Sequence, residues 1–223
     1  MKKFGKVICV ILIVASVFSL SVIASDNARY ADTLFALGLF KGTDKGYELD
    51  KTFTREEAAT ILVRLLGEEK NSENKNYSEA FNDVNKDRWS FPYVMYCYEN
   101  EITKGTANDT FSPATPISAK QFVTLVLRLL GYTEVVPETA LDTSVTLSLL
   151  NSEVTRKMKT ADEFTRNDMV YVVYRSLMTK NSDGKILADV LVDKKVITKQ
   201  EAEEFDIYKS SNTIDDLLEN LLD

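Results

Sequence analysis

The chain has 223 residues, a formal net charge of −7 and 44% hydrophobic residues, which is enough apolar material for a folded core. The acidic balance argues against nucleic acid as a partner, because phosphates call for a basic surface. The chain contains no histidine, so it lacks the means for a Ser-His or Cys-His dyad or a His-ligated metal site. We therefore expect no catalytic residue, no metal and no cofactor.

Residues 1–24 have the pattern of a signal peptide. Three lysines within the first six residues precede an apolar stretch over 7–23, and cleavage is expected after Ala24. The apolar stretch is short and interrupted by serines, so cleavage is favoured over a retained anchor, and no stable membrane span is expected afterwards. Cleavage changes the net charge from −7 to −10 and leaves Cys97, which we expect to be a small buried hydrophobe.

Three segments of the remaining chain share a helix-start cluster that is followed, after a constant spacing, by an arginine. In each cluster a Ser or Thr stands three residues before an acid or amide, which is the pattern of a capping box. Repeated units of this size usually cannot bury an apolar face alone, so we expect the copies to pack together. The clusters and their arginines are 54–57 with Arg64, 118–121 with Arg128, and 165–168 with Arg175.

Each copy is predicted to be a helix, a loop and a second helix, with the copies at 28–70, 79–132 and 139–180. The apolar residues of each second helix recur at helical spacing. The first helices are expected over 31–39, 93–101 and 141–150, and the second helices start after Thr54, Ser118 and Thr165.

The connections between these helices differ from copy to copy. Turn residues mark a loop over 41–46, whereas residues 151–163 replace this Gly-Thr loop in the third copy. Residues 134–138, which include Pro137, are expected to be a linker.

A C-terminal helical extension is predicted over 185–223. One helix is expected around 186–191, and a second begins after Thr198 with Glu201 at its third position. The acidic tail 213–223 carries leucines at helical spacing and is a candidate docking segment for a protein partner. No segment shows sustained period-two alternation, so the predicted fold class is all-α.

The second copy carries an ordered set of motifs: Phe81-Asn82-Asp83-Val84, Trp89, Ile102 to Thr106, Phe111-Ser112-Pro113 and Arg128 to Gly131. This set resembles the S-layer homology (SLH) repeat, and residues 53–58 and 164–168 are similar to the family's Ile-Thr-Arg-Ala-Glu signature. The resemblance implies three repeats, the second and third degenerate, in a pseudo-threefold helical bundle. In that family, grooves between repeats bind secondary cell-wall polysaccharide, often pyruvylated, and hold exported proteins on Gram-positive surfaces.

The resemblance also implies a set of glycan-binding residues. A guanidinium in the first turn of a helix could grip the carboxylate of a pyruvyl group, because charge, dipole and free N–H groups all favour an anion there. The Lys-Gly-Thr loops could add charge and backbone donors, and a tryptophan could stack on a sugar ring. Ala119 stands in place of the signature arginine in the second copy, where Lys120 could partly compensate. The expected residues are Arg55, Arg166, Trp89, Lys41, Gly42, Thr43, Lys104, Gly105, Thr106 and Lys120.

Structural alternatives exist for several of these residues. Arg55 could be a solvated helix start beside Glu56 and Glu57, and Trp89 could be a core anchor. The arginines that recur within the second helices are expected to pair with carboxylates of a neighbouring repeat. The acids and amides at the third helical positions are expected to be capping groups.

Three classes of function remain after these observations. The leading hypothesis is a secreted cell-wall or S-layer module that binds an anionic polysaccharide without a covalent bond. The alternative is a structural envelope protein that self-assembles or recruits a partner through 213–223. A glycosidase would need two carboxylates in a catalytic arrangement, and no such pair is recognisable, so the protein is not expected to be an enzyme.

Overall fold

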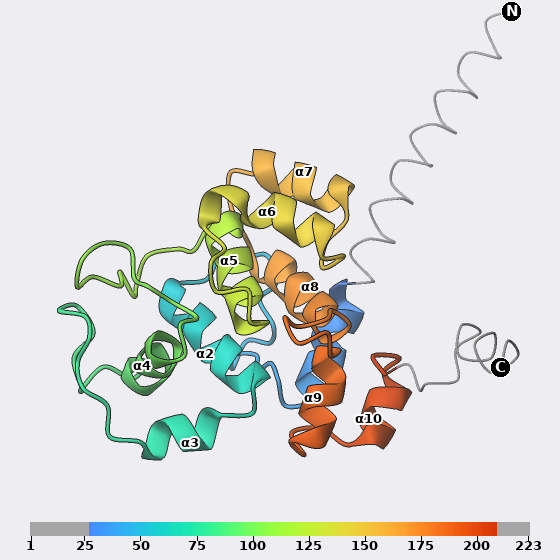
Figure 1. The fold of residues 1–223 in the computed structure, drawn as a ribbon, viewed down its shortest axis with the longest axis horizontal. Helices are drawn as coiled ribbons and strands as arrows, with labels where there is room; N and C mark the ends of the chain where they lie inside the picture. The colour runs from blue at the N-terminus through green and yellow to red at the C-terminus, as the bar shows by residue number, and fades with distance from the viewer. Residues whose placement is uncertain (1–26, 209–223) are drawn as a thin grey trace, which may run out of the picture.

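The structure, a computed structural model, describes residues 27–208, and within them all regular structure is helical apart from isolated β-bridges. The predicted all-α fold class is thereby confirmed. The predicted signal peptide and the 213–223 tail lie outside the described residues. No helix in the described range is long and apolar enough to cross a membrane. After a helical segment over 27–36, the helices are α2 (Arg55–Leu65), α3 (Glu69–Asn74), α4 (Phe91–Glu99), α5 (Ala119–Leu129), α6 (Pro137–Thr146), α7 (Ser152–Thr160), α8 (Arg166–Leu177), α9 (Leu187–Asp193) and α10 (Lys199–Glu204) (Figure 1).

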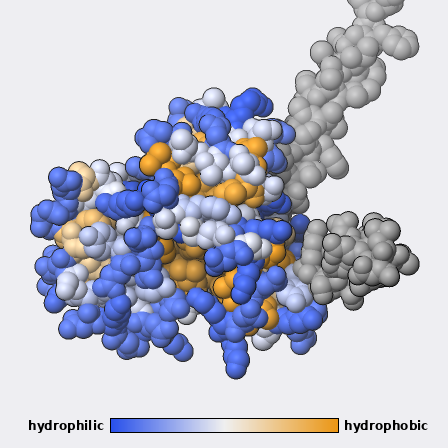
Figure 2. All heavy atoms as spheres, viewed as in Figure 1, coloured by the Kyte–Doolittle hydropathy of each residue, from blue (hydrophilic) through white to orange (hydrophobic). Residues whose placement is uncertain are grey.

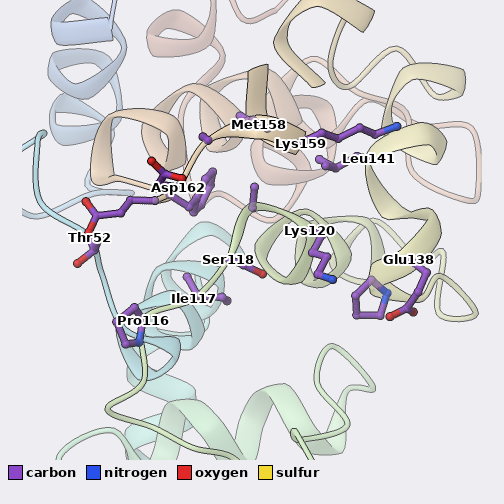
Figure 3. Close-up of a pocket in the computed structure, with 15 residues that line it drawn as sticks. Thr52, Pro116, Ile117, Ser118, Lys120, Glu138, Leu141, Met158, Lys159 and Asp162 are labelled. Atoms are coloured by element: carbon purple, nitrogen blue, oxygen red, sulfur yellow. The ribbon is translucent and has the colours of Figure 1, made fainter. Parts of the chain in front are cut away.

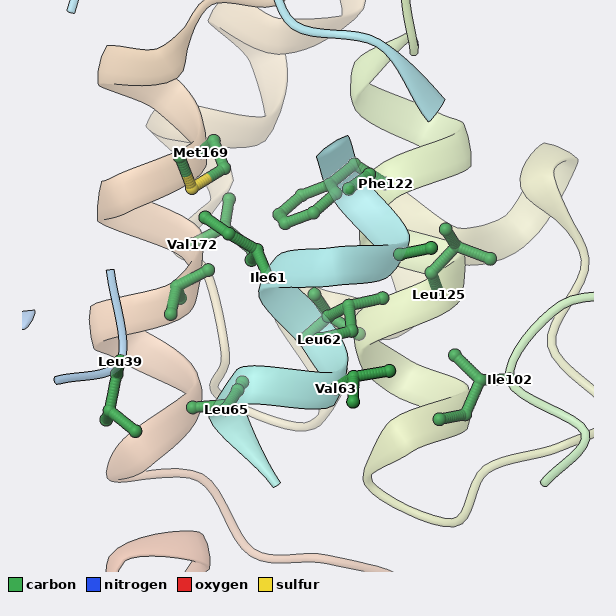
Figure 4. Close-up of a cluster of buried hydrophobic side chains, with 14 of the residues drawn as sticks. Leu39, Ile61, Leu62, Val63, Leu65, Ile102, Phe122, Leu125, Met169 and Val172 are labelled. Atoms are coloured by element: carbon green, nitrogen blue, oxygen red, sulfur yellow. The ribbon is translucent and has the colours of Figure 1, made fainter. Parts of the chain in front are cut away.

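The core lies among the three predicted second helices, with α2 between α5 and α8 (Figure 4). Three buried aromatic rings join the starts of these helices: Phe53 precedes α2, Phe122 lies in the first turn of α5, and Phe164 precedes α8. Their ring centroids are 5.3 to 5.6 Å apart in all three pairings. Aromatic rings at this separation contribute both buried area and edge or offset contacts, so this triad anchors the helix starts to one another.

The first helix of each copy ends in the same way. Its last turn is followed by a residue with positive φ, and the next two backbone amides both donate to one helical carbonyl. The residues with positive φ are Gly38, Glu101 and Ser148, and the accepting carbonyls belong to Leu34, Cys97 and Ser144. The local geometry therefore repeats across the copies even where the sequence does not.

Several predicted boundaries were wrong. A linker was expected over 134–138, but Pro137 starts α6. Proline is tolerated at the first helical position because the N–H group that it lacks would have no partner within the helix there. Helix α3 lies where no element was predicted, and α7 lies in the segment 151–163 that was expected to replace the Gly-Thr loop. Both are short and polar, and each buries only one or two side chains, so they carry little apolar periodicity.

The C-terminal extension closes the bundle against the first copy. Gly67, at the end of α2, has a φ of 71° and contacts Val196, which lies between α9 and α10. A side chain at this glycine would collide with Val196, so the close approach requires glycine. The face seen in Figure 2 is mainly hydrophilic, with apolar patches over α6 and α7 and near α9.

Candidate functional site

Each of the three core helices starts with the predicted capping box. The side chain at the third helical position accepts from the backbone N–H of the capping residue, and the capping hydroxyl accepts in return. The capping prediction is thereby confirmed. The backbone bonds are Thr54 to Glu57 at 2.6 Å, Ser118 to Gln121 at 3.0 Å and Thr165 to Asp168 at 2.9 Å.

The first turn of α2 is covered by a loop of the second copy, a contact that we call the α2 seam. The backbone N–H of Arg55 donates to Thr115 O at 3.0 Å, and that of Glu56 donates to Pro113 O at 3.1 Å. The Arg55 side chain donates from Nε to Phe111 O at 2.7 Å. Arg55 is only 3% exposed, so the solvated-start alternative is wrong.

The first turn of α8 is covered in the same register by a loop of the first copy, the α8 seam. The backbone N–H of Arg166 donates to Lys51 O, and that of Asn167 to Leu49 O, both at 2.8 Å. Arg166 Nε donates to Tyr47 O at 2.9 Å. In both seams, alternate carbonyls of a turn segment accept hydrogen bonds from the orphan N–H groups of a helix start and from one arginine.

The first turn of α5 is open, and we call this place the α5 seam. Within residues 27–208, the backbone N–H groups of Ala119 and Lys120 have no hydrogen-bond partner in another copy. The register of the other seams would bring residues 158–162 here, but α7 runs to Thr160, and no carbonyl of these described residues accepts a hydrogen bond from the start of α5.

A cavity of about 690 Å³ remains at the α5 seam. In Figure 3, Thr52 and Asp162 lie at one end of it, and Lys120 and Glu138 at the other. Apolar side chains, among them Leu141, form part of the wall. The exposed Lys120 has no carboxylate partner among the described residues, whereas Lys159, which also lines the cavity, pairs with Asp142 at 2.6 Å.

The two seam arginines differ in their electrostatic environment. Arg166 Nη1 lies 3.5 Å from Glu57 Oε1, and the guanidinium stands over the Phe40 ring. Arg55 stands over the Phe111 ring but has no ion pair in the described part of the chain. Burial lowers the pKa of the Arg55 guanidinium below its ordinary value, partly offset by the charge of Asp83.

The arginines later in the core helices have structural contacts, but not those expected. Arg64 pairs with Glu69 of its own copy at 2.7 Å. Arg128 Nε donates to Val135 O at 3.0 Å, and Arg175 Nε donates to Leu149 O at 3.2 Å. The predicted pairing with a neighbouring repeat's carboxylate is therefore wrong. Arg64 forms its ion pair within its own copy, and Arg128 and Arg175 donate to nearby backbone carbonyls.

The Lys-Gly-Thr loops use most of the donors that were expected to be free. Lys41 Nζ donates to both carboxylate oxygens of Glu69 at 3.0 Å. The backbone N–H of Thr43 donates to Gly46 O at 2.8 Å, and that of Thr106 donates to Thr110 O at 2.8 Å. The exposed Lys104 lines a polar hollow beside Gly105 and Thr106, and Gly42 packs its Cα against the backbone of Gly46.

Trp89 lies on the surface, 55% exposed, so the core-anchor alternative is wrong. The residue before it, Arg88, forms a fork with Glu56 of α2, with N–O distances of 2.7 and 2.8 Å. Ser90 donates to the same carboxylate at 2.6 Å. These bonds fix the tryptophan loop to the start of α2.

The structure brings only some of the predicted residues together. Arg55, Gly105 and Thr106 line one small pocket, whereas Lys120 lines the cavity of the α5 seam. Pro137 lines both spaces, so they adjoin. Trp89, Arg166 and the loop 41–43 line neither of them. Sequence reasoning missed Arg128 as a pocket residue and the wall formed by α7, because neither follows from local spacing.

The remaining chemistry of the described residues is limited. No group of three or more His, Cys, Asp or Glu side chains in residues 27–208 could hold a metal ion. Cys97 is buried, as predicted, and its Sγ faces Ala59 O. Burial raises the pKa of this thiol well above its ordinary value, so it is not a reactive thiolate.

Comparison with known families gives a match to the S-layer homology domain over residues 80–122. The chain contains an S-layer homology domain. The matched copy is the one with the Phe81 to Val84 leader, Trp89 and the Gly-Thr loop, although it lacks the signature arginine. The S-layer homology resemblance predicted from these motifs is thereby confirmed.

The chain spans less than a third of the length of the curated relatives described here. A middle cell wall protein of Brevibacillus brevis is 35% identical over 48% of this chain and 10% of that protein. A cell surface protein of Thermoanaerobacter kivui is 29% identical over 90% of this chain and 28% of that protein. A cellulosome-anchoring protein of Acetivibrio thermocellus is 33% identical over 42% of this chain and 19% of that protein. The family and these relatives agree with the predicted location at the cell wall or cell surface.

Proposed function

We propose that this chain is an exported module that attaches to the bacterial cell wall by binding an anionic polysaccharide at the α5 seam. Support for wall attachment comes from the S-layer homology match and from relatives named as wall, surface and anchoring proteins. Attachment of this kind requires no catalysis. The proposed partner is a secondary wall polymer that carries acidic groups, such as pyruvylated sugars.

The observation that carries the proposal is that the open helix start belongs to the matched copy. The match ends at Phe122, within the first turn of α5, and so includes Ala119 and Lys120. Two N–H groups without a partner in another copy, the positive end of the helix dipole and an uncompensated lysine all favour an anion here.

The dimensions and lining of the cavity suit a saccharide. A volume of about 690 Å³ falls within the range of pockets that enclose small organic ligands. Leu141 and Pro137 offer apolar surface for the faces of sugar rings, while Glu138 and Asp162 can accept hydrogen bonds from hydroxyl groups. Trp89 and Lys104 lie outside this cavity and are proposed as secondary contacts for a long polymer.

Co-sedimentation with purified walls of the producing bacterium tests this proposal. Lys120→Glu is expected to weaken binding about tenfold or more, because one charge-assisted hydrogen bond contributes about 1.5–3 kcal/mol. Lys70→Glu is the matched control, since it changes the net charge equally at an exposed lysine of α3. Soluble wall polymer should compete with the wild type. Equal sedimentation of both variants and the wild type would contradict the proposal.

A further inference from the structure

A pocket of about 210 Å³ lies between α7 and the start of α8, and we call it the amino-terminal pocket. Apolar side chains of both helices form part of its wall, among them Val154, Met158 and Tyr171. Asn27, where the described chain begins, also lines it. The volume is smaller than the roughly 300–1,000 Å³ of pockets for drug-sized ligands, so the occupant must be small.

The helical segment 27–36 is fixed beside this pocket by aromatic contacts with α8 (Figure 1). The ring of Tyr30 stacks on that of Tyr174, with the centroids 4.3 Å apart, and lies 5.8 Å from the ring of Tyr171. Ala31 and Leu34 of the same segment are fully buried. Because these contacts hold the first helical turn in place, the chain that precedes Asn27 has to start at the pocket wall.

The mature chain has a very short segment before Asn27. Cleavage after Ala24, as predicted, leaves Ser25 and Asp26 there. An extended chain advances at most about 3.6 Å per residue, so the new amino group lies within roughly 7 Å of Asn27. At neutral pH this group is largely an ammonium ion, because its ordinary pKa is about 7.7–8.0.

The pocket wall carries hydrogen-bond acceptors that the described chain does not use. Glu163 is exposed and forms no ion pair within residues 27–208. Asp168 accepts from Thr165 with Oδ2, whereas its Oδ1 has no partner in this range. The side chain of Asn167 likewise has no hydrogen-bond partner there. An ammonium group has three N–H donors and no acceptor, so these side chains match its requirements.

The charges of the mature terminus are also complementary to those of the pocket. Lys157 lines the pocket and pairs with Glu153 of its own helix at 2.9 Å. Both side chains of this pair are more than half exposed, so the pairing is weak and Lys157 can instead meet the carboxylate of Asp26. The terminus therefore brings one cation and one anion to a wall that carries both signs.

We propose that the amino-terminal pocket receives the α-ammonium group of Ser25, and that removal of the signal peptide creates this contact. Hydrolysis adds water across the peptide bond between Ala24 and Ser25, which leaves a carboxylate on Ala24 and an amino group on Ser25 that takes up a proton. In the precursor the same nitrogen is a neutral amide with one N–H group. The inference takes the predicted cleavage as its starting point and does not depend on polysaccharide binding.

The contact has a structural consequence for the α5 seam. Met158 and Phe164 line both the amino-terminal pocket and the cavity of that seam. An ammonium group bound to Glu163 fixes the connection between α7 and α8, which forms the wall shared by the two spaces. Processing therefore completes this part of the fold.

The first test is the pKa of the α-amino group in the full mature chain, measured by amine-reactive labelling and mass spectrometry across a pH series. Glu163, Asp168 and Asp26 raise this pKa, and Lys157 lowers it, so the net expectation is a rise of about one unit above 7.7–8.0. A chain extended by the native Ile23 and Ala24 carries its amino group further away. That group should titrate at its ordinary value.

The second test compares the thermal stability of three forms of the mature chain: with a free amino group, with an acetylated amino group and with the Ile23-Ala24 extension. At pH 6 the free form should have a Tm about 2–4 °C above the other two. Because the folded pKa is raised, this difference is fully present below the unfolded pKa of about 7.7. It is lost as the pH rises through the folded value, and should be absent by about pH 10.

Glu163→Gln should return the α-amino pKa toward its ordinary value and reduce the Tm of the free form. In the acetylated chain the same substitution should change the Tm by less than about 1 °C, which separates a lost ion pair from a general loss of stability. Glu79→Gln is the matched control, since Glu79 is exposed, lies outside the pocket and forms no ion pair among the described residues. It should leave the α-amino pKa and the Tm difference unchanged.

Three results would overturn the inference: an ordinary α-amino pKa in the free form, equal Tm values for all three forms, or a Glu163→Gln effect that is the same in free and acetylated chains. If about 50 mM ethylammonium chloride raises the Tm of the free form more than sodium chloride does, the pocket binds a separate amine and the assignment to Ser25 is wrong. All these measurements are made without wall polymer. A failure of wall sedimentation therefore contradicts the proposed function and leaves this inference standing.

Discussion

The starts of α2 and α5 have the same local structure, but the start of α2 is covered by another copy and the start of α5 is open. Both begin with a capping box and end with an arginine in the last turn. The first two amides of α2 are bonded to carbonyls of another copy, whereas those of α5 face a cavity of about 690 Å³. A helix start is therefore closed or open according to the segment that reaches it from the next copy, and not according to its own sequence.

That segment contains a turn at the closed seams and is helical at the open one. Residues 47–51 and 111–115 present alternate carbonyls around turns that have a positive φ at Glu48 and at Ser112. Residues 152–160 form α7 instead, and most of their carbonyls are used within the helix. The helix that stands in place of the Gly-Thr loop in the third copy thus leaves a cavity of about 690 Å³ at this seam.

The largest expected difference between the seams is in hydrogen exchange. The amides of Ala119 and Lys120 should exchange at least about 100-fold faster than those of Arg55 and Arg166, because only the latter are bonded across a seam. Amide exchange followed by NMR measures this directly. The Gln121 amide, bonded to Ser118 Oγ, is an internal reference for the α5 start. Equal protection at all three helix starts would show that the α5 seam is closed in solution.

Breaking the buried fork at the α2 start should have the next largest effect. Burial alone would raise the pKa of Glu56, but hydrogen bonds from Arg88 and Ser90 outweigh it and hold that pKa below its ordinary value. Because the folded pKa is depressed, the stabilisation is present above the unfolded pKa of about 4.3 and is lost as the pH falls through the folded value.

Glu56→Gln is accordingly expected to lower the free energy of unfolding by about 2 kcal/mol at neutral pH, allowing for partial exposure of Arg88. The difference from wild type should shrink from about pH 5 downward. Urea denaturation across a pH series measures it. Lys120→Gln, at the same helical position of α5, should show no such pH dependence. A difference that stays constant with pH would rule out the ionised fork as its cause.

The smallest effect is expected at the α8 seam. Glu57→Gln retains a capping box but removes the partner of Arg166, and should cost about 0.5–1 kcal/mol because Glu57 is partly exposed. Thermal unfolding of the variant and of the wild type measures this difference. A variant as stable as the wild type would show that the pairing of Arg166 with Glu57 has no influence on the seam.

Local sequence signals predicted the parts of the fold that depend on nearby residues. The capping boxes at Thr54, Ser118 and Thr165, the core helices that follow them and the buried Cys97 were all predicted correctly. These features follow from spacing and side-chain chemistry within one copy. The start of α6 at Pro137 was missed, because a proline marks a linker and a helix start equally well.

The candidate site was predicted less completely, because it depends on which copies meet. The sequence showed Glu57 and Gln121 as equivalent capping residues. Only the packing shows that Glu57 pairs with Arg166 of another copy and that Gln121 lines a pocket together with Arg55 and Arg128. The role of the 213–223 tail in partner binding or self-assembly stays a prediction, since it lies outside the described residues.

The contact between Gly67 and Val196 has a consequence for the order of assembly. It joins the end of the first copy to a segment beyond the third, so the chain must be present at least as far as Val196 before this junction can form. Contacts between residues so distant in the chain are slow to form, because a long loop must close first. A polypeptide that emerges stepwise from its N-terminus would therefore form this junction only after the segment between α9 and α10 had been released.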